Sequence, residues 1–145
     1  MTGREAAPGH VFRLRVYYED TDLAGIVYYA NYLRFIERAR TEALIELGID
    51  QAAARDREGL VFAVRRVVAD YLAPARFQDD LEVTTTTKLL AGARAELVQE
   101  VRRGSDLRFR AEVVIVCRGA DGRPRRMPAN VRAALDGLGS PSDCP

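Results

Sequence analysis

The 145-residue chain has few of the side chains on which most nucleophilic catalytic units depend. It contains a single histidine, His10, and no tryptophan, and its three serines are Ser105, Ser140 and Ser142. The histidine lies in a polar leader, and the serines lie in an expected turn and near the C-terminal end. A Ser-His-Asp or Cys-His catalytic unit is therefore not expected.

Cysteine and long apolar runs are also scarce. Cys117 lies in an alternating apolar segment and Cys144 is the penultimate residue, so the chain has neither a disulfide framework nor zinc-ligand spacing. Residues 1–10 lack the apolar core of a signal peptide. No apolar run is long enough to cross a membrane. We therefore expect a cytoplasmic protein without a metal site.

Neither sign of charge is in large excess. The chain carries 22 basic and 21 acidic residues, a net charge of +1, which argues against a dedicated nucleic-acid binder. Lys88 is the only lysine, and the remaining basic residues are arginines, which bind phosphate through paired hydrogen bonds. Glycine-rich phosphate loops are absent. An enzyme of this composition would rely mainly on carboxylates and backbone dipoles.

Length and composition fit one globular domain. At 145 residues, 48% of them hydrophobic and 30% charged, the chain is at the commonest size for a domain with its own core. We expect a single domain over residues 1–145, ordered over about 11–137. The ends, 1–10 and 138–145, are rich in Gly, Pro, Ser and Asp and are expected to be frayed.

Hydrophobic periodicity predicts one long helix among several strands. Residues 11–18 alternate between apolar and charged side chains, which is typical of a half-buried strand. From Asn31 the period becomes helical, and it predicts a helix over 31–47 with Asn31 as the N-cap and Gly48 as the C-terminal stop. Further strands are expected over 61–72, 81–90, 94–103 and 107–118, and a short helix over 129–137.

This order of elements indicates an α+β fold. Consecutive strands joined by short turns form an antiparallel sheet, and the long helix should lie on one of its faces. The outer strands of such a sheet keep free edges. Pairing an edge with a second copy of the chain would satisfy them, so we expect a dimer.

An acidic loop directly precedes the long helix. Asp20 and Asp22 lie in this loop, and the unpaired amides of a helix start form a positive pole that can stabilise an oxyanion. A carboxylate beside such a pole could attack an activated acyl group or activate water. The alternative is that both aspartates are turn or capping residues. A calcium loop is rejected, because Ala24 and Asn31 occupy two of its ligand positions.

The loop and helix resemble a known family. Residues 18–32 (YEDTDLAGIVYYANY) resemble the signature of 4-hydroxybenzoyl-CoA thioesterase-like hotdog proteins. Residues 35–42 (FIERARTE) and 70–76 (DYLAPAR) are similar to the YbgC-type branch. The similarity covers roughly residues 11–135. It implies a hotdog fold, in which a five-stranded antiparallel sheet wraps around one long central helix, here with a short C-terminal helix, and which forms dimers and often tetramers.

The resemblance also implies roles for individual residues. Asp22 occupies the position of the catalytic aspartate, which acts as nucleophile or general base on a thioester. Tyr29 occupies the position whose backbone amide polarises the thioester carbonyl. YbgC-type proteins commonly have histidine there, whereas the 4-hydroxybenzoyl-CoA type has tyrosine, as here. Asp20 is expected to hold the loop through backbone hydrogen bonds.

Candidate substrate-binding residues are more widely spread. Tyr28 and Tyr32 either line an acyl pocket or simply pack. Glu37 matches a catalytic glutamate of a related branch, but a solvated or salt-bridged residue is the simpler interpretation. The remaining candidates are a strand that walls the pocket from the partner subunit and cations for the coenzyme A phosphates. They are Val61, Phe62 and Ala63 for the wall, Arg65, Arg66, Lys88 and Arg94 for the phosphates, and Arg125 and Arg126 as further cations. Core packing explains the wall residues equally well, and ordinary surface charge is the alternative for the cations.

The sequence therefore predicts an acyl-CoA thioesterase that releases a carboxylic acid and free coenzyme A without a metal or redox cofactor. One alternative is another hotdog enzyme such as a hydratase, although hydratases usually use an Asp/His pair. The other is a non-catalytic acyl-binding or scaffold protein of an envelope or lipid-synthesis complex.

Overall fold

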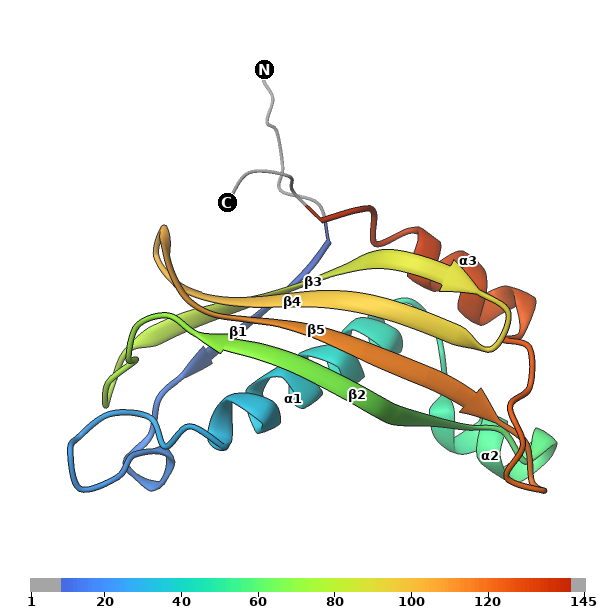
Figure 1. Ribbon diagram of the computed structural model, residues 1–145, viewed down its shortest axis with the longest axis horizontal. Helices are drawn as coiled ribbons and strands as arrows, with labels where there is room; N and C mark the ends of the chain where they lie inside the picture. Colours follow the sequence, from blue (N-terminus) through green and yellow to red (C-terminus); the bar gives the residue numbers. More distant parts are fainter. Residues whose placement is uncertain (1–8, 142–145) are drawn as a thin grey trace, which may run out of the picture.

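The computed structural model describes residues 9–141, which form one antiparallel sheet with helices packed on it (Figure 1). The five strands are hydrogen-bonded in the order β1-β3-β4-β5-β2, so β1 and β2 are the edges. The α+β prediction is confirmed. The strands are β1 (His10–Arg15), β2 (Val61–Tyr71), β3 (Asp80–Ala91), β4 (Arg94–Arg103) and β5 (Asp106–Arg118), and the helices are η1 (Tyr18–Asp20), α1 (Asn31–Glu46), α2 (Gln51–Glu58) and α3 (Ala129–Asp136).

Helix α1 crosses one face of the sheet and supplies much of the core (Figure 1). Its buried side chains recur at helical spacing and meet the inward-facing residues of β3, β4 and β5. This is the apolar stripe that the sequence predicts. The buried helix residues are Tyr32, Phe35, Ile36, Ala39 and Ala43.

The ends of α1 match the prediction only in part. Gly48 adopts φ 85° just after the helix, the left-handed conformation expected of a C-terminal stop. At the other end the N-cap is Ala30, so the prediction of Asn31 as N-cap is wrong. The Asn31 side chain donates instead to the Asp20 carbonyl at 2.9 Å. It therefore ties the helix start to the acidic loop.

Strand β1 begins one residue earlier than expected and ends three residues earlier than expected. His10 already pairs with Thr85, although we expected it in a frayed leader. The strand ends at Arg15 rather than at residue 18, because the chain turns into η1 at Tyr18. This turn brings the acidic loop to the N-terminal end of α1. The structure does not describe residues 1–8 of the expected leader, nor Ser142 and Cys144 near the C-terminal end.

Helix α2 was not expected from the sequence. Asp50 caps it by accepting from the Ala53 amide at 2.9 Å, and Gly59 ends it at φ 67°. None of its residues is fully buried, so it lacks the apolar stripe on which the helix predictions depend. With α3, it covers the end of the sheet opposite the acidic loop (Figure 1).

The edge strand β2 exposes an apolar surface. Val64, Val67, Val68 and Tyr71 each keep more than a third of their surface accessible. The strand pairs with β5 on one side, with a shift of register between Val64 and Arg66.

Among residues 9–141, no helix has both the length and the apolar character that crossing a bilayer requires.

Candidate active site

Backbone hydrogen bonds hold the acidic loop in a narrow, closed shape. Thr21 and Val27 form an isolated antiparallel bridge. The Asp22 amide donates to the Ile26 carbonyl at 3.0 Å, and the Tyr28 amide donates to the Asp20 carbonyl at 2.9 Å. The loop thus returns on itself and delivers the chain directly to the start of α1.

Asp20 is a structural residue of this loop, as predicted. Its carboxylate accepts the Tyr17 amide at 2.8 Å. Its carbonyl accepts from the Tyr28 amide at 2.9 Å and from the Asn31 side chain at 2.9 Å. With both groups engaged, Asp20 joins η1, the far side of the loop and α1.

The Asp22 side chain is exposed, and most of its bonding capacity is free. One carboxylate oxygen, Oδ1, accepts from the Ala24 amide at 2.9 Å, which fixes the orientation of the side chain. Within residues 9–141, the second oxygen makes no hydrogen bond or ion pair with the protein. An oriented carboxylate with a free oxygen can attack a carbonyl carbon or accept a proton from water.

The chain just before the first turn of α1 leaves two backbone donors next to this loop. The amides of Asn31, Tyr32 and Leu33 donate to the carbonyls three residues earlier, at 2.8, 3.4 and 3.2 Å. The amides of Tyr29 and Ala30, by contrast, donate to no group of the described chain. One of these two free donors is therefore at Tyr29, the residue whose amide the family resemblance implies polarises the carbonyl, and its role there is taken up as a proposal below.

Aromatic side chains surround the loop. Tyr28 and Tyr29 are about half exposed, and their ring centroids lie 5.0 Å apart. The Tyr29 ring meets Tyr71, at the end of β2, edge-on with centroids 6.0 Å apart. Tyr71 was not predicted as a site residue, although it lies within the segment 70–76 that carries the family resemblance. Its contact with Tyr29 is the reason to add it.

Tyr32 packs in the core rather than facing solvent. Its side chain is 4% exposed and stacks on Phe109 with ring centroids 4.9 Å apart. Its hydroxyl accepts from the Ala75 amide at 3.0 Å, and the Ala75 carbonyl accepts from the Val27 amide at 2.8 Å. Burial raises the pKa of the Tyr32 hydroxyl, which therefore stays neutral. Of the two roles considered for Tyr32, this geometry favours packing and support of the loop.

We expect Tyr32→Phe to affect the protein more than Tyr29→Phe. Removing the Tyr32 hydroxyl leaves the buried Ala75 amide without its acceptor, which costs about 1–3 kcal/mol. The proposed donor at Tyr29 is the backbone amide, so removal of the half-exposed hydroxyl should leave stability and turnover nearly unchanged. Thermal unfolding and turnover of the two variants measure the difference. Equal effects would show that the Tyr32–Ala75 contact does not support the loop.

The other predicted site residues lie elsewhere. Val61, Phe62 and Ala63 begin β2, at the far end of that strand from Tyr71. Glu37 is exposed on α1 and accepts from the Thr41 hydroxyl at 2.7 Å. Only Asp22, Tyr28 and Tyr29 share the loop. Among residues 9–141, no group of three or more His, Cys, Asp or Glu side chains is arranged to hold a metal ion.

The predicted phosphate-binding cations differ in their surroundings. Lys88 forms an ion pair with Glu112 at 3.0 Å, and Arg94 pairs with Glu96 at 3.4 Å. The Lys88 ammonium and Arg110 hold the pKa of the Glu112 carboxyl below its usual range. Arg65 and Arg66 are exposed at the register shift in β2, and neither forms an ion pair within the described part of the chain.

Comparison with known proteins places this geometry in a family. Residues 16–135 match the model of the thioesterase-like superfamily. The chain is 37% identical over 131 residues to the acyl-CoA thioesterase YbgC of Haemophilus influenzae, covering 90% of this chain and 96% of that protein. It is 39% identical over 122 residues to the acyl-CoA thioester hydrolase YbgC of Escherichia coli O157:H7, covering 83% and 90%.

A solved structure gives the same result for the fold. The crystal structure of a probable thioesterase from Bartonella henselae superposes with a TM-score of 0.79 at 36% identity, covering 83% of this chain and 99% of that one. The hotdog fold predicted from the sequence is thereby confirmed. Because the family model matches most of the length of this chain, the chain belongs to the thioesterase-like superfamily.

Proposed function

We propose that the chain hydrolyses acyl-CoA thioesters to a carboxylic acid and free coenzyme A, with Asp22 as the catalytic carboxylate. The observation that carries the proposal is the pairing, on one loop, of an oriented carboxylate with a free oxygen and an unpaired amide at Tyr29. The YbgC relatives are named for acyl-CoA thioester hydrolysis, which supports the same reaction. The reaction as proposed uses neither a metal nor a redox cofactor.

The proposed chemistry assigns one task to each group. In the general-base version, Asp22 takes a proton from water, and the resulting hydroxide adds to the thioester carbonyl carbon. In the nucleophilic version, the carboxylate itself adds, and water later cleaves the acyl-aspartyl anhydride. In both, the oxyanion accepts the Tyr29 N–H, and collapse of the tetrahedral intermediate expels the coenzyme A thiolate. Tyr28 and Tyr29 offer apolar surface beside the acyl group.

A thiol-release assay across aromatic, short-chain and long-chain acyl-CoAs tests the proposal and separates the alternatives. Hydrolysis produces free thiol together with the acid. A hydratase would instead convert a 2-enoyl-CoA to its hydroxyacyl-CoA with the thioester intact. An acyl-binding or scaffold protein would bind the acyl-CoA and release no thiol. The acyl group that gives the highest kcat/KM identifies the substrate class.

We propose that Arg65 and Arg66 contribute more to coenzyme A binding than Lys88 and Arg94. The first two are exposed without a carboxylate partner, whereas binding phosphate through Lys88 or Arg94 requires breaking an ion pair. Alanine at Arg65 or Arg66 should raise KM several-fold with little change in kcat, because a remote phosphate contact binds substrate and transition state alike. Alanine at Lys88 is the matched control. If none of the four variants raises KM, the nucleotide binds elsewhere, with Arg125 and Arg126 as the next candidates.

We propose that the chain forms a dimer, and that dimers pair into tetramers. The edge strand β2 presents exposed valines and an unpaired hydrogen-bonding edge, which a second copy would cover. Light scattering at micromolar concentration should report at least twice the 16.1 kDa mass of one chain. Val68→Lys, on the exposed face of β2, should shift the mass toward the monomer. A monomeric wild-type protein would contradict this prediction.

We propose, as the sequence predicts, that the protein is located in the cytoplasm.

A further inference from the structure

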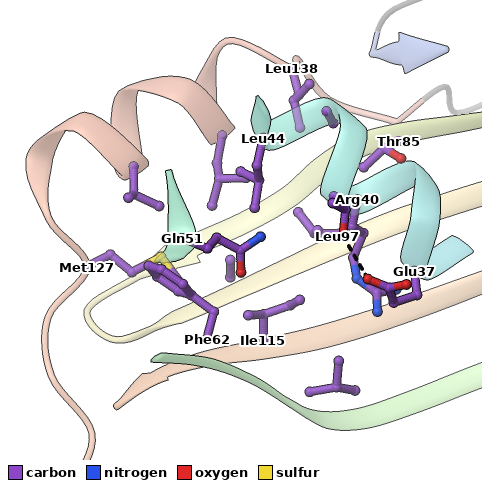
Figure 2. A pocket seen from close by; sticks show the side chains of 16 residues that line it. Glu37, Arg40, Leu44, Gln51, Phe62, Thr85, Leu97, Ile115, Met127 and Leu138 are labelled. Carbon is purple, nitrogen blue, oxygen red and sulfur yellow. Dashed lines mark hydrogen bonds between the residues drawn. The ribbon is translucent and has the colours of Figure 1, made fainter. Parts of the chain in front are cut away.

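A cavity of about 210 Å³ lies between α1, α2, α3 and the sheet (Figure 2). Helices α2 and α3 lie at the end of the molecule opposite the acidic loop (Figure 1). None of its lining residues belongs to the loop at residues 17–29. Protein interiors keep few voids larger than a water molecule. An apolar cavity of about 150 Å³ already holds a benzene molecule, so this one has room for a somewhat larger organic molecule.

Most of the cavity wall is apolar. Its side chains come from the start of β2, from β4 and β5, and from the segment that contains α3. A wall of this kind excludes strongly hydrated ligands and favours a hydrocarbon body. The residues that give it this character are Phe62, Leu97, Ile115, Met127, Val131 and Leu138.

One end of the cavity is polar, and a cation lies there. Arg40 is partly buried, and its guanidinium donates to the Gln99 Oε1 atom at 2.9 Å. Gln99 is fully buried and is fixed in turn, because its Nε2 donates to the Ile36 carbonyl at 2.9 Å and to the Thr85 hydroxyl at 3.0 Å. This network orients the guanidinium beside the cavity, because its acceptor Gln99 is itself fixed.

Arg40 has no anionic partner in the described chain. Its one hydrogen-bond acceptor, Gln99, is neutral, and no carboxylate of residues 9–141 forms an ion pair with it. Burial lowers the pKa of Arg40, as expected for a cation partly removed from water. A cation in this position is stabilised by an acceptor that carries the opposite charge.

Glu37 is the charged group nearest to Arg40 on the cavity lining. Its side chain is exposed, it accepts from the Thr41 hydroxyl at 2.7 Å, and Figure 2 shows it at the same end of the cavity as Arg40. Its negative charge favours the charged form of Arg40 without forming an ion pair with it. Glu37 would repel an anionic ligand bound at Arg40. Removing its charge should therefore leave binding of an anion equal or tighter, which gives the inference a second test.

We propose that this cavity binds a small monocarboxylic acid, with the hydrocarbon body among the apolar side chains and the carboxylate paired with Arg40. The inference concerns residues outside the proposed catalytic loop and does not depend on the proposed hydrolysis. It predicts how affinity changes with ligand charge as well as with mutation.

Calorimetric titration of the wild-type protein with octanoate, 1-octanol and octylamine tests the ligand class. These probes share the hydrocarbon chain and differ in the charge of the end group. We expect octanoate to bind about tenfold or more tightly than 1-octanol, because a charged acceptor forms the stronger hydrogen bond to a guanidinium. Octylamine should bind weakest. Octanoate binding no tighter than 1-octanol, or absent at millimolar concentration, would overturn the proposal.

Three variants locate the site. Arg40→Gln should bring octanoate to the affinity of 1-octanol, whereas the neighbouring isosteric change Glu37→Gln should leave octanoate binding equal or tighter. Val131→Phe places a ring in the cavity and should abolish binding of both ligands. If Arg40→Gln and Glu37→Gln weaken octanoate binding alike, the carboxylate does not pair with Arg40. If Arg40→Gln does not fold, the ligand series with the wild-type protein and the octanoate affinity of Glu37→Gln still test whether the cavity binds a carboxylate.

Binding at the proposed catalytic loop is a separate outcome. Asp22→Asn lies outside the cavity and should keep the wild-type affinity for octanoate. Loss of octanoate binding in Asp22→Asn, with Val131→Phe unaffected, would place the acid in the loop and overturn the inference.

Discussion

Asp22→Asn should lower the turnover of acyl-CoA by about 10²–10⁴-fold, the usual cost of removing a general base, and by more if Asp22 is the nucleophile. The asparagine keeps an oxygen that can accept the Ala24 amide, so the loop should hold its shape. What is lost is the charge on the free oxygen. The measurement is kcat for thiol release from the best acyl-CoA, with KM expected to change little.

Asp20→Asn is the matched control for this variant. It removes the same charge from the same loop, but the Asp20 carboxylate is already occupied by the Tyr17 amide. We expect a lower melting temperature and a much smaller loss of turnover. The assignment of Asp22 is wrong if folded Asp22→Asn retains turnover within about threefold of wild type, or if the two variants lose turnover equally.

Phe109→Ala should destabilise the fold by about 3–5 kcal/mol, the range for removing a buried phenylalanine. Phe109 is fully buried, stacks on Tyr32 and meets Tyr71 with ring centroids 5.1 Å apart. Tyr32 in turn supports the acidic loop through Ala75. The melting temperature should fall by about 10 °C or more for a domain of this size.

Phe77→Ala provides the comparison for Phe109→Ala. Phe77 is 47% exposed and meets Tyr18 only edge-on, so its truncation should cost less than about 1 kcal/mol. Both variants remove the same ring close to the acidic loop. Similar losses of stability in thermal unfolding would contradict the role given to the stack of Phe109 and Tyr32.

The part of the site that the sequence predicts is the part formed by neighbouring residues. Asp20, Asp22 and Tyr29 lie within ten residues of one another, and the loop that joins them is a continuous motif. The helical period after Asn31 predicts the buried stripe of α1 because each of its residues meets the same sheet. Local pattern and tertiary packing agree here, which makes the prediction possible.

Other features depend on contacts between distant residues, or lack a pattern. Arg40 and Gln99 are 59 positions apart, and nothing in the sequence around either indicates that they bond. The contact between Tyr32 and Ala75 spans 43 positions, so Tyr32 could not be separated from a pocket-lining residue. Helix α2 is polar and buries no side chain fully, so only Asp50 and Gly59 at its ends could have indicated it.

The most direct test of the proposed function is a single-turnover experiment with the wild-type protein in excess over an acyl-CoA. Isolating one turnover separates cleavage from product release and from weak substrate binding. We predict that the bound acyl-CoA releases one equivalent of thiol and one equivalent of carboxylic acid, together in the general-base version and with the thiol first in the nucleophilic version. Acyl-CoA that stays bound and intact, with no thiol released for any acyl group tested, would contradict the account and identify the chain as an acyl-CoA-binding protein.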